Sequence, residues 1–388
     1  MHTYKRLALI LILLFVVGTA VFADEAKVLT DIFHEGPARV TYTKQFEAAV
    51  PLSSMQQLLV QLTMQLGTFK QVEGTSNPYT IVFEQGTVTA YISLDGQGSV
   101  AGLQFTEVIS SKLTLADSVK QITDLDAQTA VLIRRNGQTL ASYQADVPLA
   151  VGSAFKLGIL AALDDAVKAN RMQWGQSVRL EKAYKSLPMG ILQDWPVGSQ
   201  LTIETLATLM ISQSDNTAAD ALLSLVGRQN VDRYLMHSKP TLSTSEMFKL
   251  KNPKNSDILA RFRSSSVSQR LLLLEELKER ELPNAGLFSG DPVAIDVEWF
   301  MTAKELATLI ERLQSLDLMT VNAGLATKER WQRVAFKGGS EPGVLNLTTY
   351  LEDTQKNRYT VVVTANTSKK PLDEKKIMES YQAILNYL

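Results

Sequence analysis

Hydrophobic and polar positions follow two periods along the chain, one typical of helices and one typical of strands. In the first 110 residues, helical spacing predicts helices over 25–36 and 51–67, the second with Leu58, Leu59, Leu62 and Leu66 near 3.6 residues apart. Alternation predicts strands over 39–46, 79–95 and 99–108, with turns at the QG and DGQG sequences. Residues 24–112 are therefore predicted to form a small α+β domain, which contains no chemical motif and serves for docking or as a spacer.

The remainder of the chain begins and ends with strand patterns and is helical between them. A short helix within 110–128 precedes a hairpin over 129–146, with Asn136-Gly137 at its turn. Helical patterns fill 153–226 and recur over 268–281 and 302–316, and strand patterns return over 333–340, 344–353 and 358–367 before a closing helix. We therefore predict one antiparallel sheet, assembled from both ends of residues 113–388, with a helical subdomain between its parts.

Composition excludes several classes of chemistry. The formal net charge of −1 over 388 residues, without a basic stripe, argues against a nucleic-acid partner. The chain has no cysteine, which rules out disulfides, thiol nucleophiles and zinc–cysteine sites. It has three histidines, and neither His34 nor His237 has a spacing that suggests a metal ligand. A serine nucleophile here would more readily use a lysine or carboxylate base than a histidine, and we expect no metal or cofactor.

The first 23 residues have the three parts of an export signal. MHTYKR is basic, LALILILLFVVG is apolar, and VFA ends at Ala23, where signal peptidase would cleave. The apolar run is short for a membrane span. We therefore predict export to the periplasm or the medium after cleavage, with membrane contact only through an uncleaved signal.

The stretch VGSAFKLGIL places Ser153 and Lys156 three residues apart where a helical pattern begins. Residues i and i+3 share a helix face, so the hydroxyl and the amine can approach each other. Burial of Lys156 would lower its pKa and allow the neutral amine to accept the serine proton. The alternative is a helix cap followed by a lysine whose stem lies on apolar surface and whose ammonium is in water.

Two further polar stretches could share a site with this pair. Ser214-Asp215-Asn216 separates two apolar helical runs, where a helix cap is the alternative explanation. Lys337 ends an alternating strand, and Gly338-Gly339 would let a ligand approach the strand backbone closely. For that strand, the alternative is an edge strand that turns into a loop.

The three stretches occur in the order Ser-x-x-Lys, Ser-Asp-Asn and Lys-x-Gly, and the chain over about 115–388 thereby resembles the penicillin-recognising serine enzymes, class A β-lactamases among them. The sequence VGSQLTIETLATLMISQSDNTAADALL extends this resemblance beyond the triplet. Residues 24–112 resemble the small α+β domain of exported β-lactamase-like serine hydrolases, a group that includes a protein from clavulanic acid gene clusters.

The resemblance implies a role for each of these residues. Ser153 would be the nucleophile that accepts the acyl group, Lys156 its base, and Ser214 a proton shuttle that Lys337 assists. The oxyanion would lie between the backbone N–H groups of Ser153 and Ser340. The implied substrate contacts are Asn216, Gly339 and Ser340.

Two departures from the family pattern affect the expected activity. Gly338 replaces the usual hydroxyl residue between lysine and glycine, although Ser340 could partly substitute. No stretch matches the motif of the deacylating glutamate; six carboxylates lie in the right part of the chain without its neighbours: Glu276, Glu279, Glu281, Asp291, Asp296 and Glu298. We expect a serine hydrolase for a small or peptide-like ester or amide. The alternatives are a true β-lactamase and a penicillin- or peptidoglycan-binding protein without turnover.

Overall fold

The computed structural model describes residues 25–110 and 114–388, so the signal segment predicted over 1–23 lies outside the described residues. The described residues fold as two compact units, which divide between Leu115 and Ala116. Within the described ranges, no helix is long and apolar enough to span a membrane.

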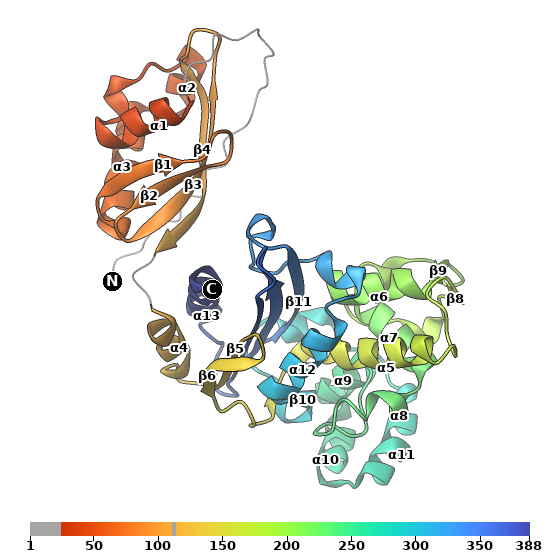
Figure 1. Ribbon diagram of the computed structural model, residues 1–388. Helices are drawn as coiled ribbons and strands as arrows, with labels where there is room; N and C mark the ends of the chain where they lie inside the picture. Colours follow the sequence, from red (N-terminus) through yellow and green to blue (C-terminus); the bar gives the residue numbers. More distant parts are fainter. Residues whose placement is uncertain (1–24, 111–113) are drawn as a thin grey trace. The chain divides into compact units, whose positions relative to one another are not determined.

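The first unit packs helices against one four-stranded antiparallel sheet (Figure 1). Leu29 and Ile32 of the first helix and Leu62 and Leu66 of the third are buried with the strands in one hydrophobic core. The elements are α1 (Glu25–His34), α2 (Lys44–Ala49), α3 (Leu52–Leu66), β1 (Phe69–Glu73), β2 (Tyr79–Phe83), β3 (Gly86–Leu94) and β4 (Val100–Ser110), with the strands paired in chain order.

The strand predicted over 39–46 is wrong, because its second half forms helix α2. The Thr43 side chain accepts a hydrogen bond from the Phe46 backbone N–H at 3.2 Å and so caps the helix, and Phe46 is buried in the core. Before the cap, Tyr42 forms a single bridge with Val100. A local cap outweighs an alternating pattern here because that pattern covers only a few residues.

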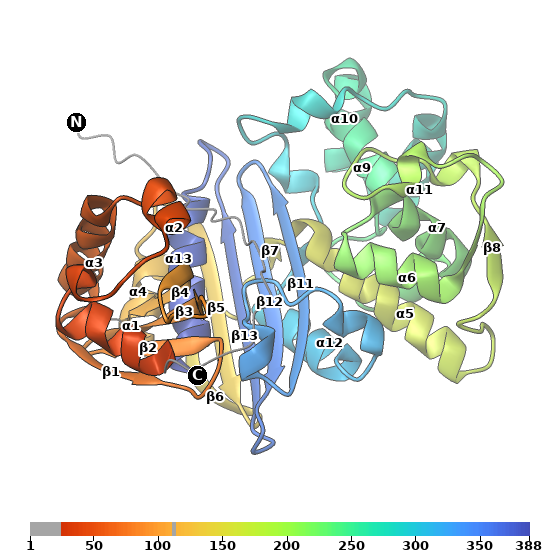
Figure 2. The same ribbon diagram turned by 90° about the horizontal axis from the view of Figure 1, so that it is seen from above.

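The second unit is built on a five-stranded antiparallel sheet, which confirms the predicted fold class. Its strands are β5 (Gln128–Arg135), β6 (Gln138–Tyr143), β11 (Arg333–Glu341), β12 (Val344–Glu352) and β13 (Arg358–Asn366), in the order β11-β12-β13-β5-β6. Figure 2 shows helix α13 (Glu374–Tyr387) on one face of this sheet and helix α12 (Ala303–Leu313) on the other. Tyr381 of α13 is fully buried, and its hydroxyl donates to Thr349 Oγ1 of β12 at 2.7 Å. Helix α4 (Leu115–Thr123) lies beside α13, where Ser380 Oγ donates to Gln121 Oε1 at 2.9 Å.

The helical subdomain lies beyond α12, on the side of the sheet away from α13 (Figure 2). Its central helix, α5, is buried over almost its whole first ten residues, which explains the long apolar pattern after residue 156. The helices are α5 (Lys156–Lys168), α6 (Ile203–Ser212), α7 (Asn216–Val226), α8 (Arg228–Val231), α9 (Thr244–Lys251), α10 (Ser256–Ser264) and α11 (Val267–Lys278). Two short strand pairs complete it, β7 (Leu149–Ala150) with β10 (Phe300–Met301) and β8 (Ser177–Arg179) with β9 (Gln200–Thr202).

A buried asparagine joins the sheet to the segment that leads into α5. Asn366, the last residue of β13, accepts a hydrogen bond from the Ala150 backbone N–H at 2.7 Å and donates to the Ala150 carbonyl oxygen at 2.8 Å. Both residues are almost completely buried. One side chain therefore replaces two backbone partners and fixes the chain just before Gly152–Phe155.

We predict that Asn366→Ala lowers the free energy of unfolding of the second unit by about 2–4 kcal/mol, because it leaves a buried N–H and a buried carbonyl without partners. Urea denaturation followed by tryptophan fluorescence measures the change, because Trp299 and Trp331 are buried in this unit. An unchanged midpoint would show that the pair contributes nothing to stability.

Candidate active site

The chain makes a tight turn before α5, and this turn positions Ser153. Residues Gly152–Phe155 form one turn of 3₁₀ helix, entered through Gly152 at φ 48°, and α5 follows directly from Lys156. Strand β11 runs against this turn so closely that a Cβ on Gly339 would lie 2.4 Å from the Ser153 backbone nitrogen and 2.2 Å from the Val151 carbonyl oxygen. Only glycine fits there, and it brings the backbone of β11 beside that of Ser153.

Lys156 follows this turn directly as the first residue of α5, and no part of it is exposed. Its Nζ is 2.5 Å from the Ser214 carbonyl oxygen and 2.7 Å from Asn216 Oδ1, and it is 3.3 Å from Ser214 Oγ. A neutral amine has two N–H bonds, which the two short contacts satisfy, and one lone pair. The lone pair is then available to accept a proton from a neighbouring hydroxyl.

The surroundings of Lys156 favour that neutral form. Burial lowers the pKa of Lys156 well below its usual range, and the nearby ammonium of Lys337 lowers it further. The carboxylates of Asp220 and Asp215 oppose this shift. The alternative interpretation, a lysine whose ammonium reaches water, does not fit a fully buried side chain.

Ser214 lies between two lysines. Its backbone has φ 57°, a left-handed conformation that costs a residue with a Cβ about 1 kcal/mol or more. This conformation places Ser214 Oγ 3.1 Å from Lys337 Nζ and 3.3 Å from Lys156 Nζ. Burial lowers the pKa of Lys337 to about 7. A hydroxyl in this position can pass a proton between the two amines and a bound substrate.

Asp215 holds Ser214 and the neighbouring loop in place. It is fully buried, and its Oδ1 caps α7 by accepting from Ala218 N at 2.8 Å. Its Oδ2 accepts from the backbone N–H groups of Ile191 and Leu192 at 2.7 and 2.9 Å. The cap that the sequence suggests is therefore present, and it coexists with the cluster around Lys156.

Asn216 is almost fully engaged by the protein itself. Its Oδ1 accepts from Lys156, and its Nδ2 donates to the Leu187 carbonyl oxygen at 3.0 Å. It is 4% exposed, so little of the side-chain amide is left for a substrate contact. Of the two aromatic residues in the 184–195 loop, Tyr184 packs against the core and Trp195 is 40% exposed.

Asp220, which sequence reasoning missed, lies one helical turn after Asn216 on α7. It is buried and accepts from the Thr244 backbone N–H at 2.6 Å, from Thr244 Oγ1 at 2.9 Å and from Ser245 N at 2.9 Å. Burial raises its pKa to about 7. The i, i+4 spacing from Asn216 was the sequence signal for its position on the same helix face. It fixes the start of α9 against α7.

The six carboxylates considered for deacylation lie in two environments. Glu298 is buried, and the remaining five are exposed: Glu276, Glu279, Glu281, Asp291 and Asp296. Asp296 forms a two-bond ion pair with Arg263, at 2.7 and 2.8 Å, and Glu276 pairs with Arg261. The structure therefore does not bring these five together with Ser153 in any buried cluster.

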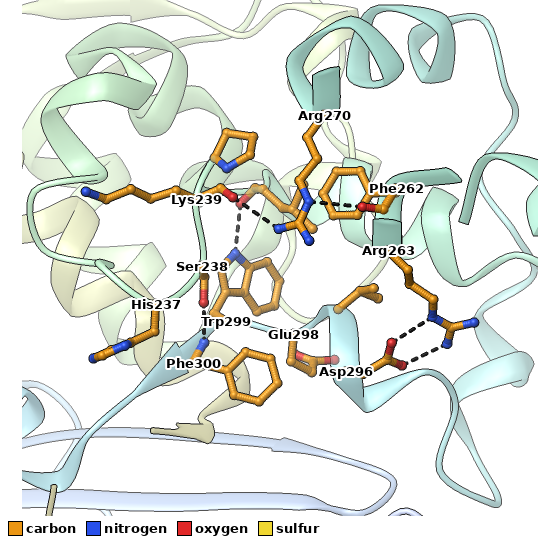
Figure 3. Close-up of a pocket in the computed structure, with 13 residues that line it drawn as sticks. His237, Ser238, Lys239, Phe262, Arg263, Arg270, Asp296, Glu298, Trp299 and Phe300 are labelled. Atoms are coloured by element: carbon orange, nitrogen blue, oxygen red, sulfur yellow. Dashed lines mark hydrogen bonds and ion pairs between the residues drawn. The ribbon is translucent and has the colours of Figure 1, made fainter. Parts of the chain in front are cut away.

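A cavity of about 290 Å³ opens next to β10 and contains none of the four residues Ser153, Lys156, Ser214 and Lys337 (Figure 3). It is lined by Trp299, Phe262 and Phe300 among apolar residues, and by Arg263 and Arg270 among charged ones. His237 also lines it and lies 3.2 Å from Glu305. Within the described part of the chain, no group of three or more histidine, aspartate or glutamate residues could hold a metal ion.

Comparison with known proteins identifies the class. The Beta-lactamase enzyme family matches residues 114–388, so the chain belongs to that family. A β-lactamase from Sphaerobacter thermophilus DSM 20745 shares 20% identity and a TM-score of 0.50, over 70% of this chain and 94% of its own. The protein PBP-A shares 15% identity at a TM-score of 0.48, over 70% of this chain and 94% of its own. A mutant class A β-lactamase of the last common ancestor of Gram-negative bacteria shares 15% identity at a TM-score of 0.49, over 70% of this chain and 97% of its own.

The family match and the fold define a serine hydrolase of the β-lactamase-like class. No curated protein matches the sequence.

We predict that Gly339→Ala abolishes covalent labelling of Ser153, because the new Cβ would displace β11 from the turn Gly152–Phe155 (the nucleophile turn). Intact-mass spectrometry with an activated ester measures the labelled fraction. Gly175→Ala is the matched control, since a Cβ there meets no atom within 4 Å. Equal labelling of the two variants would contradict the close approach of β11.

Proposed function

We propose that the chain is an exported serine hydrolase that cleaves an ester or amide through an acyl-enzyme on Ser153. The observation that supports this most is the full burial of Lys156 next to the Ser153 turn, with its amine within hydrogen-bond distance of Ser214 and Asn216. Desolvation disfavours the charged form of a lysine, so burial without an ion-pair partner among the described residues favours a neutral amine that can act as a base.

In the proposed acylation, the Lys156 amine accepts the proton of Ser153 Oγ while the oxygen attacks the substrate carbonyl. The oxyanion then forms between the backbone N–H groups of Ser153 and Ser340, on the turn and strand that Gly339 holds together. When the tetrahedral intermediate collapses, the leaving group takes a proton through Ser214. Lys337, at 3.1 Å from Ser214 Oγ, stabilises the shuttle and a substrate anion.

Release of the acyl group requires a water molecule and a base. No stretch of the sequence matches the motif of the deacylating glutamate, and the only buried one of the six candidate carboxylates, Glu298, is bonded to Lys251. We propose slow hydrolysis of β-lactams and faster hydrolysis of less hindered esters or amides. A true β-lactamase would instead turn over nitrocefin rapidly, and a binding protein without turnover would bind the same ligands after Ser153→Ala.

Export stays part of this proposal and rests on the N-terminal sequence. MHTYKR, the apolar run and VFA at Ala23 are its support, together with the absence of cysteine from the chain. The N-terminal residue of the protein recovered from the periplasm or the medium tests cleavage after Ala23.

We predict that Ser153→Ala eliminates labelling by a fluorophosphonate or penicillin probe and lowers hydrolysis of an activated ester by about 1,000-fold or more, as expected for loss of a nucleophile. Intact-mass spectrometry reports the adduct and its lifetime. Ser264→Ala, at an exposed serine, is the control and retains full labelling. Unchanged esterase activity in Ser153→Ala would exclude the proposed mechanism.

We predict that acylation by an uncharged activated ester rises with pH and that this rise ends well below the ordinary lysine pKa of 10.5. The base acts only when deprotonated, and a lowered pKa moves the rise to lower pH. Single-turnover rates measured from about pH 5 to 10 test this expectation. A rate still rising about tenfold per unit near pH 10 would contradict a neutral Lys156.

A further inference from the structure

A second buried cluster of charged side chains lies at the end of β11. Lys251, the last residue of α9, contacts Glu298 Oε1 and lies 2.6 Å from Glu341 Oε2. The side chains of Lys251 and Glu298 are 1% and 0% exposed, and that of Glu341 is 12% exposed. This cluster joins three segments that are far apart in the sequence.

The cluster has one ammonium for two carboxyl groups. The oxygen Glu298 Oε2 indicates how the excess negative charge is neutralised. Among the described residues, none provides a hydrogen bond to the buried Glu298 Oε2. The carboxyl groups of Glu298 and Glu341 nevertheless contact the same ammonium, that of Lys251, which brings them close to each other. Two carboxylates cannot bond to each other, but a carboxylic acid and a carboxylate can share one proton. With that proton, the cluster is neutral, and the proton can supply the partner that Glu298 Oε2 lacks.

The position of Glu341 on β11 connects the cluster to the active site. Strand β11 pairs with β12 in uninterrupted register from Arg333 to Glu341. Side chains two apart therefore point to one face, so Lys337, Gly339 and Glu341 form a row. Ser340, whose N–H is the proposed oxyanion donor, lies between the glycine that touches the nucleophile turn and the glutamate that Lys251 holds.

Glu298 is connected to the same turn through the residue that follows it. The next residue, Trp299, stacks on Phe155 of the nucleophile turn with ring centroids 3.8 Å apart, and its carbonyl oxygen accepts from Val151 N at 2.9 Å. Figure 3 shows Glu298 and Trp299 as neighbours on the wall of the cavity. The cluster thus holds both β11 and the segment that supports Phe155.

We propose that Glu298 and Glu341 share one proton and, with Lys251, form a neutral clamp that positions the Ser340 N–H against the Ser153 turn. The three residues are positioning residues and do not touch the reacting atoms. The catalytic part of this inference rests on the proposed function, because Ser340 matters only if Ser153 is acylated.

The clamp has a defined response to pH. Burial and the charge of Glu341 raise the pKa of Glu298 to about 8, although Lys251 opposes the shift. Above that pH the proton leaves, and the buried carboxylate of Glu298 and the partly buried carboxylate of Glu341 share one ammonium. The other charged groups around Glu298 line the adjoining cavity or its rim: Arg263 paired with Asp296, together with Arg270, Lys239 and His237. These groups do not supply a second buried cation to the cluster.

Glu298→Gln tests the shared proton without any need for activity. The folded protein binds the Glu298 proton up to about pH 8, whereas the unfolded chain releases it near 4.5. Between these values the wild type therefore loses stability as pH rises, by up to about tenfold in the folding constant per pH unit relative to Glu298→Gln. Urea denaturation at several pH values measures the ratio of the wild-type folding constant to that of Glu298→Gln. Contributions from Lys337 are present in both proteins and cancel in this ratio. A ratio independent of pH would overturn the shared proton.

Acylation kinetics then test the positioning. Glutamine can still donate to Glu341 and accept from Lys251, so Glu298→Gln should acylate like the wild type at pH 7 and should keep its rate where the wild type declines above about pH 8. Lys251→Met should lower the acylation rate while leaving the half-saturating probe concentration unchanged. Asp296→Asn, two residues away, is the control and should follow the wild-type profile. Parallel profiles for Glu298→Gln and wild type would overturn the positioning role.

The two proposals fail in different ways. If no probe acylates the wild type at any pH, the proposed function fails, and the stability ratio still decides whether the proton is shared. If Ser153 is acylated but Lys251→Met, folded as judged by circular dichroism, acylates at the wild-type rate, the clamp fails and the proposed function stands.

Discussion

The desolvated amine of Lys156 is the constraint around which the helical subdomain is arranged. An unpaired ammonium at this depth would cost several kcal/mol, so the fold must keep the amine neutral and still satisfy its N–H bonds. The acceptors are the Ser214 carbonyl oxygen and Asn216 Oδ1, both at the start of α7. Their positions depend on the left-handed backbone of Ser214 and on the Asp215 cap that stabilises it.

The same constraint extends to the loop over 185–195. Asp215 uses its second oxygen to accept from two N–H groups of that loop, and a Cβ on Gly190 would lie 2.2 Å from this oxygen. The Lys185 ammonium holds the loop from its other side by donating to the carbonyl oxygens of Leu192, Gln193 and Trp195. One carboxylate, that of Asp215, thus connects the loop to the segment that holds the acceptors of Lys156.

Much of this arrangement could be predicted from the sequence, because it follows from local patterns. The five strands of the sheet have strong alternation, and Lys156, Ser214 and Lys337 meet as their order along the chain suggests. The strand predicted over 39–46 was wrong, since a threonine cap decides the structure of a stretch that short. A carboxylate base could not be identified from sequence position. Sequence spacing does not encode burial, and burial is what distinguishes Glu298 from the five exposed carboxylates.

Burial acts on acids and bases in opposite directions, and this explains how the site divides its protons. The desolvation that favours a neutral Lys156 also favours a protonated Asp220 on α7, and it raises the pKa of Asp220 to about 7. Asp220 is already bonded to Thr244 and Ser245, so it stabilises α9 rather than offering a free carboxylate. In the proposed mechanism, uptake of an acyl group needs a neutral lysine, whereas its release needs an ionised base with access to water. Asp220 does not meet the second requirement, because it is buried and its pKa is raised.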